Sequence, residues 1–385
     1  MRFFCSATIW LSAAGFTLTA SCLPIDAAFA QAAPPPSTLP VPAKAAGPQT
    51  PSAEALKQWR ATMVRASRPR GGCFKVTYPS TEWQPVPCGT PPHKPHFPGE
   101  DFTAHFNGNI SQAEGSFTNV TGVTSVTSGG NANAYSLQLN TSPINTQACQ
   151  SSPDPQNCYG LEQFLYDTDG NSGNAYMEYW LKDYGPPGTQ CPPPNVADCS
   201  SGVQPNGWCP FTNNNQVDCV IQSRNSATVG AVPITSLDQL KLRGGIDATT
   251  GDWITITTPG NVMDTVPGDN YFPELAVDQW YITEFNILGE CCEETADFNS
   301  GSSLTVSISL IGTTGELPSC AEETFSAESN NLILTTPVTT SSVPSPTLEF
   351  DESNSFGTVK ASCPGVSVGD THIKTFLITH DPQLI

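Results

Sequence analysis

The sequence predicts an all-β protein, a sandwich of two antiparallel sheets. Many short apolar stretches with alternating side chains follow residue 100, and turns rich in Gly, Asn, Asp or Pro separate them. Only 13% of the 385 residues are charged, and 36 Pro and 31 Gly leave little room for long helices. No internal repeat of fixed period is visible, so one large sandwich domain accounts for the body of the chain.

The first 30 residues are typical of a secretory signal. Arg2 is followed by an apolar stretch over residues 9–23, and Ala28-Phe29-Ala30 forms a cleavage site with small residues. Lipoprotein processing at Cys22 is the alternative. We therefore expect export to the extracellular space or the periplasm, and no transmembrane segment in the mature chain.

Residues 31–72 are predicted to be a Pro/Ala-rich linker with a short basic helix. Ser52 is a suitable N-cap, and three arginines follow the helix. One face of the helix is apolar, with Leu56, Trp59 and Met63. The segment is interpreted either as a propeptide removed near the arginines or as a solvated spacer. It is expected to lie outside the sandwich, which then spans residues 73–385.

The cysteines predict a disulfide framework. The chain has 14 Cys, and removal of the signal leaves an even number. Cys73 with Cys88 and Cys149 with Cys158 bracket short loops. Two further bridges are expected within a disulfide-rich insertion at 186–222, among Cys191, Cys199, Cys209 and Cys219. The pairing of the remaining four, Cys291, Cys292, Cys320 and Cys363, stays open. A zinc site is the rival interpretation, but no Cys-x-x-Cys pair supports it.

The charge is strongly acidic, with a formal net charge of −20. From residue 95 onward, 6 basic residues face 32 acidic ones. This argues against a nucleic-acid partner, because phosphate binding needs clustered Lys and Arg. The acidity indicates either the solubility of an exported protein or adaptation to acid. No phosphate-binding loop, nucleophile elbow or His-Glu-x-x-His motif occurs, so neither a cofactor nor a metal is expected.

Strands are expected along the whole body of the chain. The clearest pair is a hairpin whose turn spans residues 168–173. The predicted strands are residues 102–106, 115–120, 134–139, 161–167, 175–183, 253–257, 280–288, 304–311, 332–334, 347–350 and 372–379.

Three of these strands place a carboxylate or an amide among aromatic residues. Alternation puts Glu178 on one face with Tyr176 and Trp180, while Gln163 and Glu284 lie in two other apolar strands. A carboxylate on an apolar sheet face is costly unless it is paired or used in chemistry. The alternative is a sheet face that is open to water.

The order of these segments resembles the glutamic peptidases of the eqolisin type, which have a concanavalin-like sandwich. The similarity covers residues 110–312. Family segments of the form Ile-Leu-Gln-Thr, Ala-Trp-Tyr-Glu-Trp-Tyr-Pro and Ala-Glu-(Phe/Trp)-Ile-x-Glu correspond to those around Gln163, Glu178 and Glu284. The resemblance implies that Gln163 is the catalytic glutamine and that Glu178 and Glu284 belong to the site.

One position departs from the family pattern. The catalytic glutamate of the family lies four residues after the position matched by Glu284, where this chain has Leu288. Either Glu284 or the nearby Glu290 then takes the role, or the protein is not a peptidase. The chain also resembles secreted bacterial proteins that carry a similar Glu-Phe-Asn segment.

The sequence therefore predicts a secreted acid-type hydrolase of the glutamic-peptidase type. In that mechanism a glutamate activates water, and the Gln163 amide stabilises the oxyanion. One alternative is a carbohydrate-binding or carbohydrate-cleaving sandwich, with Tyr176, Trp180 and Trp280 stacking on sugars and Glu178 and Glu284 as acid and nucleophile. Another is a non-catalytic surface or interaction protein. The expected partner is a protein or polysaccharide substrate outside the cell.

Overall fold

The computed structural model describes residues 51–363 apart from 93, 95–99, 197–198, 200–201, 204, 214, 278, 312–315, 325–328, 356 and 358–360. The helix and strands of this part belong to one compact unit that begins at Pro51. The expected signal at 1–30, the linker up to residue 50 and the expected strand at 372–379 lie outside the described residues.

The described strands form two antiparallel sheets of nine strands each and one small sheet. Sheet 1 has the order β2-β1-β15-β14-β13-β4-β18-β22-β21. Its strands are β1 (Cys73–Thr77), β2 (Gln84–Val86), β4 (Gln112–Thr121), β13 (Lys241–Asp247), β14 (Gly251–Thr258), β15 (Val262–Pro267), β18 (Ser303–Ile311), β21 (Ile333–Ser341) and β22 (Thr347–Ser353).

Sheet 2 has the order β10-β11-β9-β8-β7-β16-β3-β19, and the short β12 pairs with β9. Its strands are β3 (Glu100–His105), β7 (Ala134–Asn140), β8 (Tyr159–Asp169), β9 (Gly173–Gly185), β10 (Cys209–Asn213), β11 (Gln216–Gln222), β12 (Ala227–Thr228), β16 (Ile282–Leu288) and β19 (Ser319–Thr324). The small sheet consists of β20 (Ser329–Asn330), β17 (Thr295–Phe298), β5 (Val126–Ser128) and β6 (Asn131–Ala132). Short 3₁₀ helices occur at η1 (Gln147–Ser151), η2 (Ile234–Gln239) and η3 (Pro273–Ala276).

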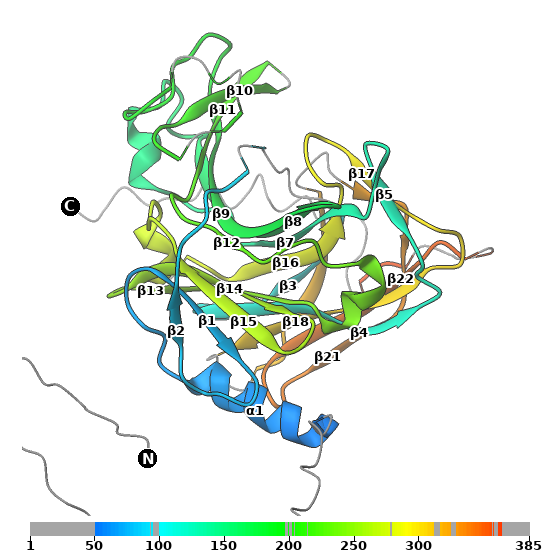
Figure 1. Ribbon diagram of the computed structural model, residues 1–385. Helices are drawn as coiled ribbons and strands as arrows, with labels where there is room; N and C mark the ends of the chain where they lie inside the picture. Colours follow the sequence, from blue (N-terminus) through cyan, green and yellow to red (C-terminus); the bar gives the residue numbers. More distant parts are fainter. Residues whose placement is uncertain are drawn as a thin grey trace, which may run out of the picture. The chain divides into compact units, whose positions relative to one another are not determined.

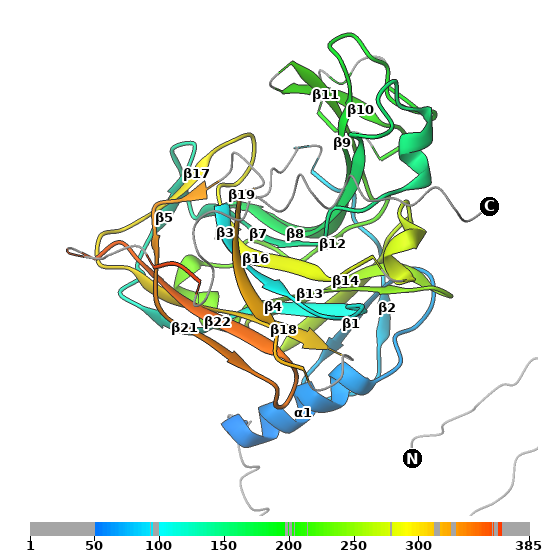
Figure 2. The same cartoon turned by 180° about the vertical axis from the view of Figure 1, so that it is seen from behind.

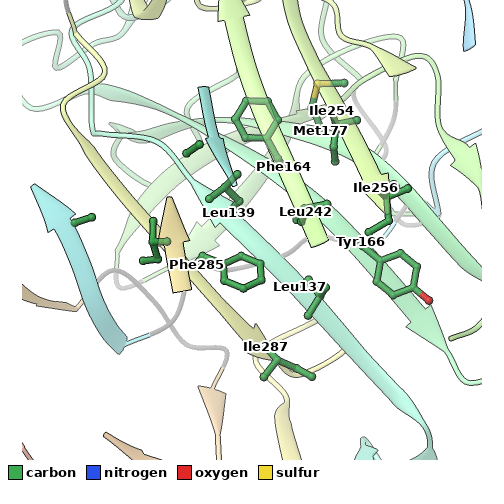
Figure 3. Packing of buried hydrophobic residues seen from close by; sticks show 14 of the residues in the cluster. Leu137, Leu139, Phe164, Tyr166, Met177, Leu242, Ile254, Ile256, Phe285 and Ile287 are labelled. Atoms are coloured by element: carbon green, nitrogen blue, oxygen red, sulfur yellow. The ribbon is translucent and has the colours of Figure 1, made fainter. Parts of the chain in front are cut away.

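The two large sheets stack face to face, and their inner faces form the main core (Figures 1 and 2). Sheet 2 contributes Leu137, Leu139, Phe164, Met177 and Phe285, and sheet 1 contributes Leu242, Ile254 and Ile256 (Figure 3). Every second residue of these strands points inward, because side chains alternate along a strand. This arrangement confirms the predicted all-β sandwich with two antiparallel sheets.

Two glycines of sheet 1 make room for rings from sheet 2. A Cβ atom on Gly244 would lie 2.2 Å from the Phe164 ring, and one on Gly115 would lie 2.0 Å from the Phe285 ring. Only a residue without a side chain permits so close an approach of backbone and ring. The Phe164 ring of β8 therefore packs directly on the backbone of β13 at Gly244.

Gly244→Val is expected to lower the free energy of unfolding by about 1–3 kcal/mol or more, because the added atoms overlap the Phe164 ring. Urea denaturation of the variant measures this loss. A Gly244→Val/Phe164→Leu double variant should be less destabilised than the sum of its single changes, since the smaller side chain relieves the overlap. Strict additivity of the two effects would contradict this account.

Helix α1 (Ala53–Arg65) begins at the residue that the sequence indicates. The Ser52 hydroxyl oxygen accepts a hydrogen bond from the Ala55 amide at 3.2 Å. Figure 1 shows the helix on the side of sheet 1 that faces away from sheet 2. The segment is therefore ordered and capped next to the sandwich, and its removal as a propeptide stays a prediction.

The apolar face of α1 packs against the outer face of sheet 1. Trp59 and Met63 are 6% and 3% exposed and contact Val76 of β1 and Met263 of β15. The Trp59 indole N–H also donates to the Ser80 carbonyl at 2.6 Å. Burial of these two large side chains stabilises the docked helix, since each removes apolar surface from water. Helix α1 therefore packs on the outer face of sheet 1, outside the core between the two sheets.

Six disulfides join all twelve cysteines that follow residue 30. The pairs are Cys73–Cys88, Cys149–Cys158, Cys191–Cys219, Cys199–Cys209, Cys291–Cys292 and Cys320–Cys363. The two expected local bridges and the two bridges within the insertion are confirmed, and the open set resolves into a bond between neighbours and a long-range bond. Such a framework forms in an oxidising, non-cytoplasmic compartment.

None of the helices in the described part of the chain is long and apolar enough to cross a membrane.

Candidate functional site

The β8–β9 hairpin carries the predicted glutamine and one predicted glutamate on the same face of sheet 2. Phe164 and Met177 point into the core between the sheets. Their neighbours Gln163 and Glu178 therefore lie on the opposite face, and they are directly opposed across the two strands. The predicted hairpin thus places these two side chains next to each other.

Five polar residues form a continuous row across this face, one from each of five adjacent strands. In order across β11, β9, β8, β7 and β16 they are Gln222, Glu178, Gln163, Asn140 and Glu284, each directly opposite the next. We call this set the polar row. All five are buried, with exposures between 0% and 3%. Glu284 lies two strands from Gln163, a backbone separation of about 10 Å.

Hydrogen bonds join the members of the polar row. The Gln163 amide donates from Nε2 to Asn140 Oδ1 at 3.1 Å, and Asn140 Nδ2 donates to Glu284 Oε2 at 2.9 Å. At the other end, Gln222 Nε2 donates to Glu178 Oε1 at 2.8 Å. Asn140 therefore couples the predicted glutamine to the predicted glutamate through its own amide.

The Gln163 amide has a second partner along β7. Its Nε2 also donates to Gln138 Oε1 at 3.1 Å, and Gln138 Nε2 donates to the Ser136 hydroxyl at 3.1 Å. The Gln163 carbonyl oxygen Oε1 meets no donor among the described residues. A buried acceptor without a donor costs about 1–3 kcal/mol, so this position favours a ligand that brings an N–H or O–H group.

Glu290, the alternative glutamate, lies outside the polar row. It follows Gly289 beyond the end of β16 and forms an ion pair with Lys94. The Lys94 backbone carbonyl in turn accepts a hydrogen bond from Gln222 Nε2 at 3.0 Å. Glu290 is thus held by a fixed positive charge, whereas Glu284 is held by a neutral amide next to Gln163.

The predicted aromatic residues do not form an open platform. Trp180 shares the face of Glu178 but is fully buried against the disulfide-rich insertion, with Val203 and Cys209 in the same cluster. Tyr176 is also buried on this side. Trp280 instead lies in the core between the sheets, where its ring stacks on Phe164 with 5.9 Å between centroids. The structure therefore separates Trp280 from the other two side chains.

A second carboxylate pair lies on the core side of the same strand. Glu162 precedes Gln163 and faces Asp252 of β14. Burial raises the pKa of Glu162 well above its ordinary value, and the neighbouring Asp252 raises it further. Burial also raises the pKa of Asp252, which accepts hydrogen bonds from the Tyr179 hydroxyl and from the Asn270 amide, the latter at 2.8 Å. This pair belongs to the core and does not touch the polar row.

The polar row places an amide and a carboxylate on one buried sheet face. Gln163 provides N–H donors and Glu284 a carboxylate, and the Asn140 side chain lies between them and bonds to both. Every member of the polar row is closed off from solvent.

Sequence reasoning missed three members of this network, namely Gln138, Asn140 and Gln222. The alternation in residues 134–140 carried the signal for the first two, because Ser136, Gln138 and Asn140 occupy every second position between apolar residues. Gln222 carried a weaker signal of the same kind, since it alternates in β11 with the apolar Val217, Cys219 and Ile221.

No protein-family model matches the sequence, and no curated protein does either. The chain is a disulfide-rich β-sandwich protein.

Proposed function

We propose that the protein is a secreted hydrolase of the glutamic-peptidase type that cleaves peptide bonds. The observation that supports this most strongly is the register of sheet 2, which puts Gln163 and Glu284 in one buried row on one face. Strands β8 and β16, which are more than a hundred residues apart in the chain, both pair with β7 to bring this amide and this carboxylate into one row.

The register also favours Glu284 over Glu290 as the catalytic glutamate. Glu284 matches the first glutamate of the family segment, and Glu284, not Glu290, lies in the polar row with Gln163. Leu288 pairs with Ser136, four residues along β7 from Asn140, and so lies away from Gln163.

In the proposed reaction Glu284 takes a proton from a water molecule, whose oxygen attacks the carbonyl carbon of the peptide. The negative charge that develops on the carbonyl oxygen is stabilised by an N–H of Gln163. The proton on Glu284 then passes to the leaving amine, so that water has been added across the bond. Because Gln163 Nε2 already donates to Asn140 and Gln138, the substrate displaces one of these two bonds.

The spacing of the carboxylates disfavours a glycosidase. Glu178 and Glu284 are separated by three strand steps, about 14 Å between backbones. Retaining glycosidases need about 5–5.5 Å and inverting ones about 6.5–9.5 Å between carboxyl groups. Glu178 is moreover bonded to Gln222, on the side away from Glu284.

Secretion is part of the same proposal. The disulfide framework indicates an oxidising compartment, and the predicted signal at residues 1–30 would deliver the chain to the periplasm or the exterior. A protein substrate would be met there.

The test is an assay of the mature protein against an unfolded protein substrate over pH 2–8. The wild type should cleave it, and Gln163→Leu should lower kcat by about 10²- to 10³-fold, the usual cost of losing one oxyanion donor. Gln239→Leu is the control, since Gln239 is exposed in η2. Absence of cleavage at every pH, or cleavage that Gln163→Leu leaves intact, would refute the peptidase proposal. Hydrolysis of a polysaccharide instead, lost in Glu178→Gln, would support the glycosidase alternative.

A further inference from the structure

A cavity of about 200 Å³ lies on the outer face of sheet 1, under the chain that leaves helix α1. Its walls are the segment 63–68, Trp83, Gln112 and Arg243 together with Trp253, Thr255 and Met263. Because it faces away from sheet 2, it is separate from the polar row, and an inference about it does not depend on the proposed peptidase activity.

The lining of the cavity is positively charged. Arg65, Arg68 and Arg243 line it, and none of its lining residues is acidic. Arg243 donates to Glu114 from Nε at 3.0 Å and from Nη2, but Lys241 shares the same carboxylate at 3.1 Å. One carboxylate therefore serves two cations, and the two other arginines of the cavity add charge that it does not balance.

Arg68 is the cation on which this excess of positive charge acts most strongly. Its guanidinium lies 3.1 Å from the centroid of the Trp253 ring, a cation–π contact that fixes it over the cavity wall. Burial and, to a lesser extent, the neighbouring Arg243 lower the pKa of Arg68 to about 9, although Asp247 acts in the opposite direction. A bound anion would offset both unfavourable effects.

The rest of the wall is apolar. Met63, Met263, Trp83 and Trp253 supply thioether and ring surfaces beside the arginines. A free phosphate would leave these surfaces without contact, whereas an aromatic or branched acid would cover them. A cavity of about 150 Å³ is enough to hold benzene, so this one accommodates a ring with a carboxylate attached.

We propose that this cavity is a binding site for a small organic carboxylate with an apolar body. The planar guanidinium of Arg68 matches the carboxylate in a two-point hydrogen bond. The apolar body then lies between Trp83 and the two methionines. The arginines favour a negatively charged group and the rest of the wall favours an apolar one, so the ligand needs both.

Isothermal titration calorimetry of the full mature chain with benzoate tests the proposal, with benzyl alcohol and inorganic phosphate as separate ligands. Benzoate should bind, benzyl alcohol and phosphate should bind at least about tenfold more weakly, and Arg68→Gln should weaken benzoate binding by at least about tenfold. Arg224→Gln is the matched control, because Arg224 pairs with Asp269 and does not line the cavity. It should leave benzoate binding unchanged.

If Arg68→Gln does not fold, Arg65→Gln replaces it, since Arg65 is exposed and also lines the cavity. The proposal is overturned if benzoate does not bind, if benzyl alcohol binds equally well, if phosphate binds more tightly than benzoate, or if neither arginine variant weakens benzoate binding.

Discussion

Glu284→Gln is expected to lower kcat on an unfolded protein substrate by about 10²- to 10⁴-fold, the contribution typical of a general base. Gln has nearly the same shape as Glu, and its side-chain oxygen can still accept the hydrogen bond from Asn140 Nδ2. The melting temperature should therefore change little. Measuring activity and thermal unfolding on the same preparation distinguishes loss of the general base from loss of the folded structure.

Two matched variants show which glutamate acts. Glu290→Gln breaks the ion pair with Lys94 but leaves the polar row intact, so its kcat should stay close to that of the wild type. Glu178→Gln tests the residue directly opposite Gln163. Loss of activity in Glu290→Gln with retention in Glu284→Gln would show that Glu290, not Glu284, is the catalytic glutamate.

The second large effect concerns stability against pH. We expect the free energy of unfolding of the wild type to fall as the pH rises from about 4.5 to about 7. Burial raises the pKa of Glu352 to about 7, although amides of Asn286 and Asn330 partly offset it, and burial likewise raises the pKa of Glu162. A carboxyl group whose pKa is raised by folding stabilises the protein below its unfolded-state pKa, and that stabilisation is lost as the pH rises through the folded-state pKa. For Glu352 alone this amounts to about 3 kcal/mol.

Chemical denaturation between pH 3 and 8 measures this dependence. Glu162→Gln and Glu352→Gln should each flatten the curve and raise stability at pH 7 relative to the wild type. Glu114→Gln is the control, because the stabilisation by Glu114 depends on pH in the opposite direction. Although burial raises it, the pKa of Glu114 is lowered to about 2 by Arg243 and Lys241, so its stabilisation is present at neutral pH and is lost as the pH falls below about 4. A free energy of unfolding of the wild type that rises towards pH 8 would contradict this prediction.

This result would also decide between the two interpretations of the acidic composition. Solubility requires only exposed carboxylates, whereas Glu162, Asp252 and Glu352 are buried. Buried carboxyl groups that are protonated in acid are what adaptation to an acidic environment predicts.

Much of the fold could be predicted from the sequence, because most strands alternate. The hairpin predicted at residues 161–167 and 175–183 became β8 and β9, which are longer at both ends. Strand β13 was missed, since Gly244-Gly245 disfavours a strand locally. Packing reverses that preference, because the Phe164 ring occupies the space above Gly244. Strand β21 contains Pro337, which is tolerated at an irregular register on the last strand of the sheet.

The candidate site could be predicted in its parts but not in its connections. Alternation placed Glu178 on one face with Tyr176 and Trp180, and in the structure Gln163 lies directly opposite Glu178. The pairing order β9-β8-β7-β16 was out of reach, because it joins segments more than a hundred residues apart. Asn140 therefore remained unnoticed, although it is the residue that links Gln163 to Glu284. Trp280 was grouped with Trp180 by residue type alone, and only the sheet stacking reveals that it faces the core.

The bond between Cys291 and Cys292 has a consequence of its own. A cross-link stabilises a protein chiefly by shortening the free loops of the unfolded chain, and a link between adjacent residues shortens none. The Cys320–Cys363 bond, by contrast, closes a loop over a sequence separation of 43. Cys292 is also exposed to solvent. Opening this bond would therefore release no loop of the chain, which makes the turn after β16 a suitable point for attaching a thiol-reactive reporter next to Glu290.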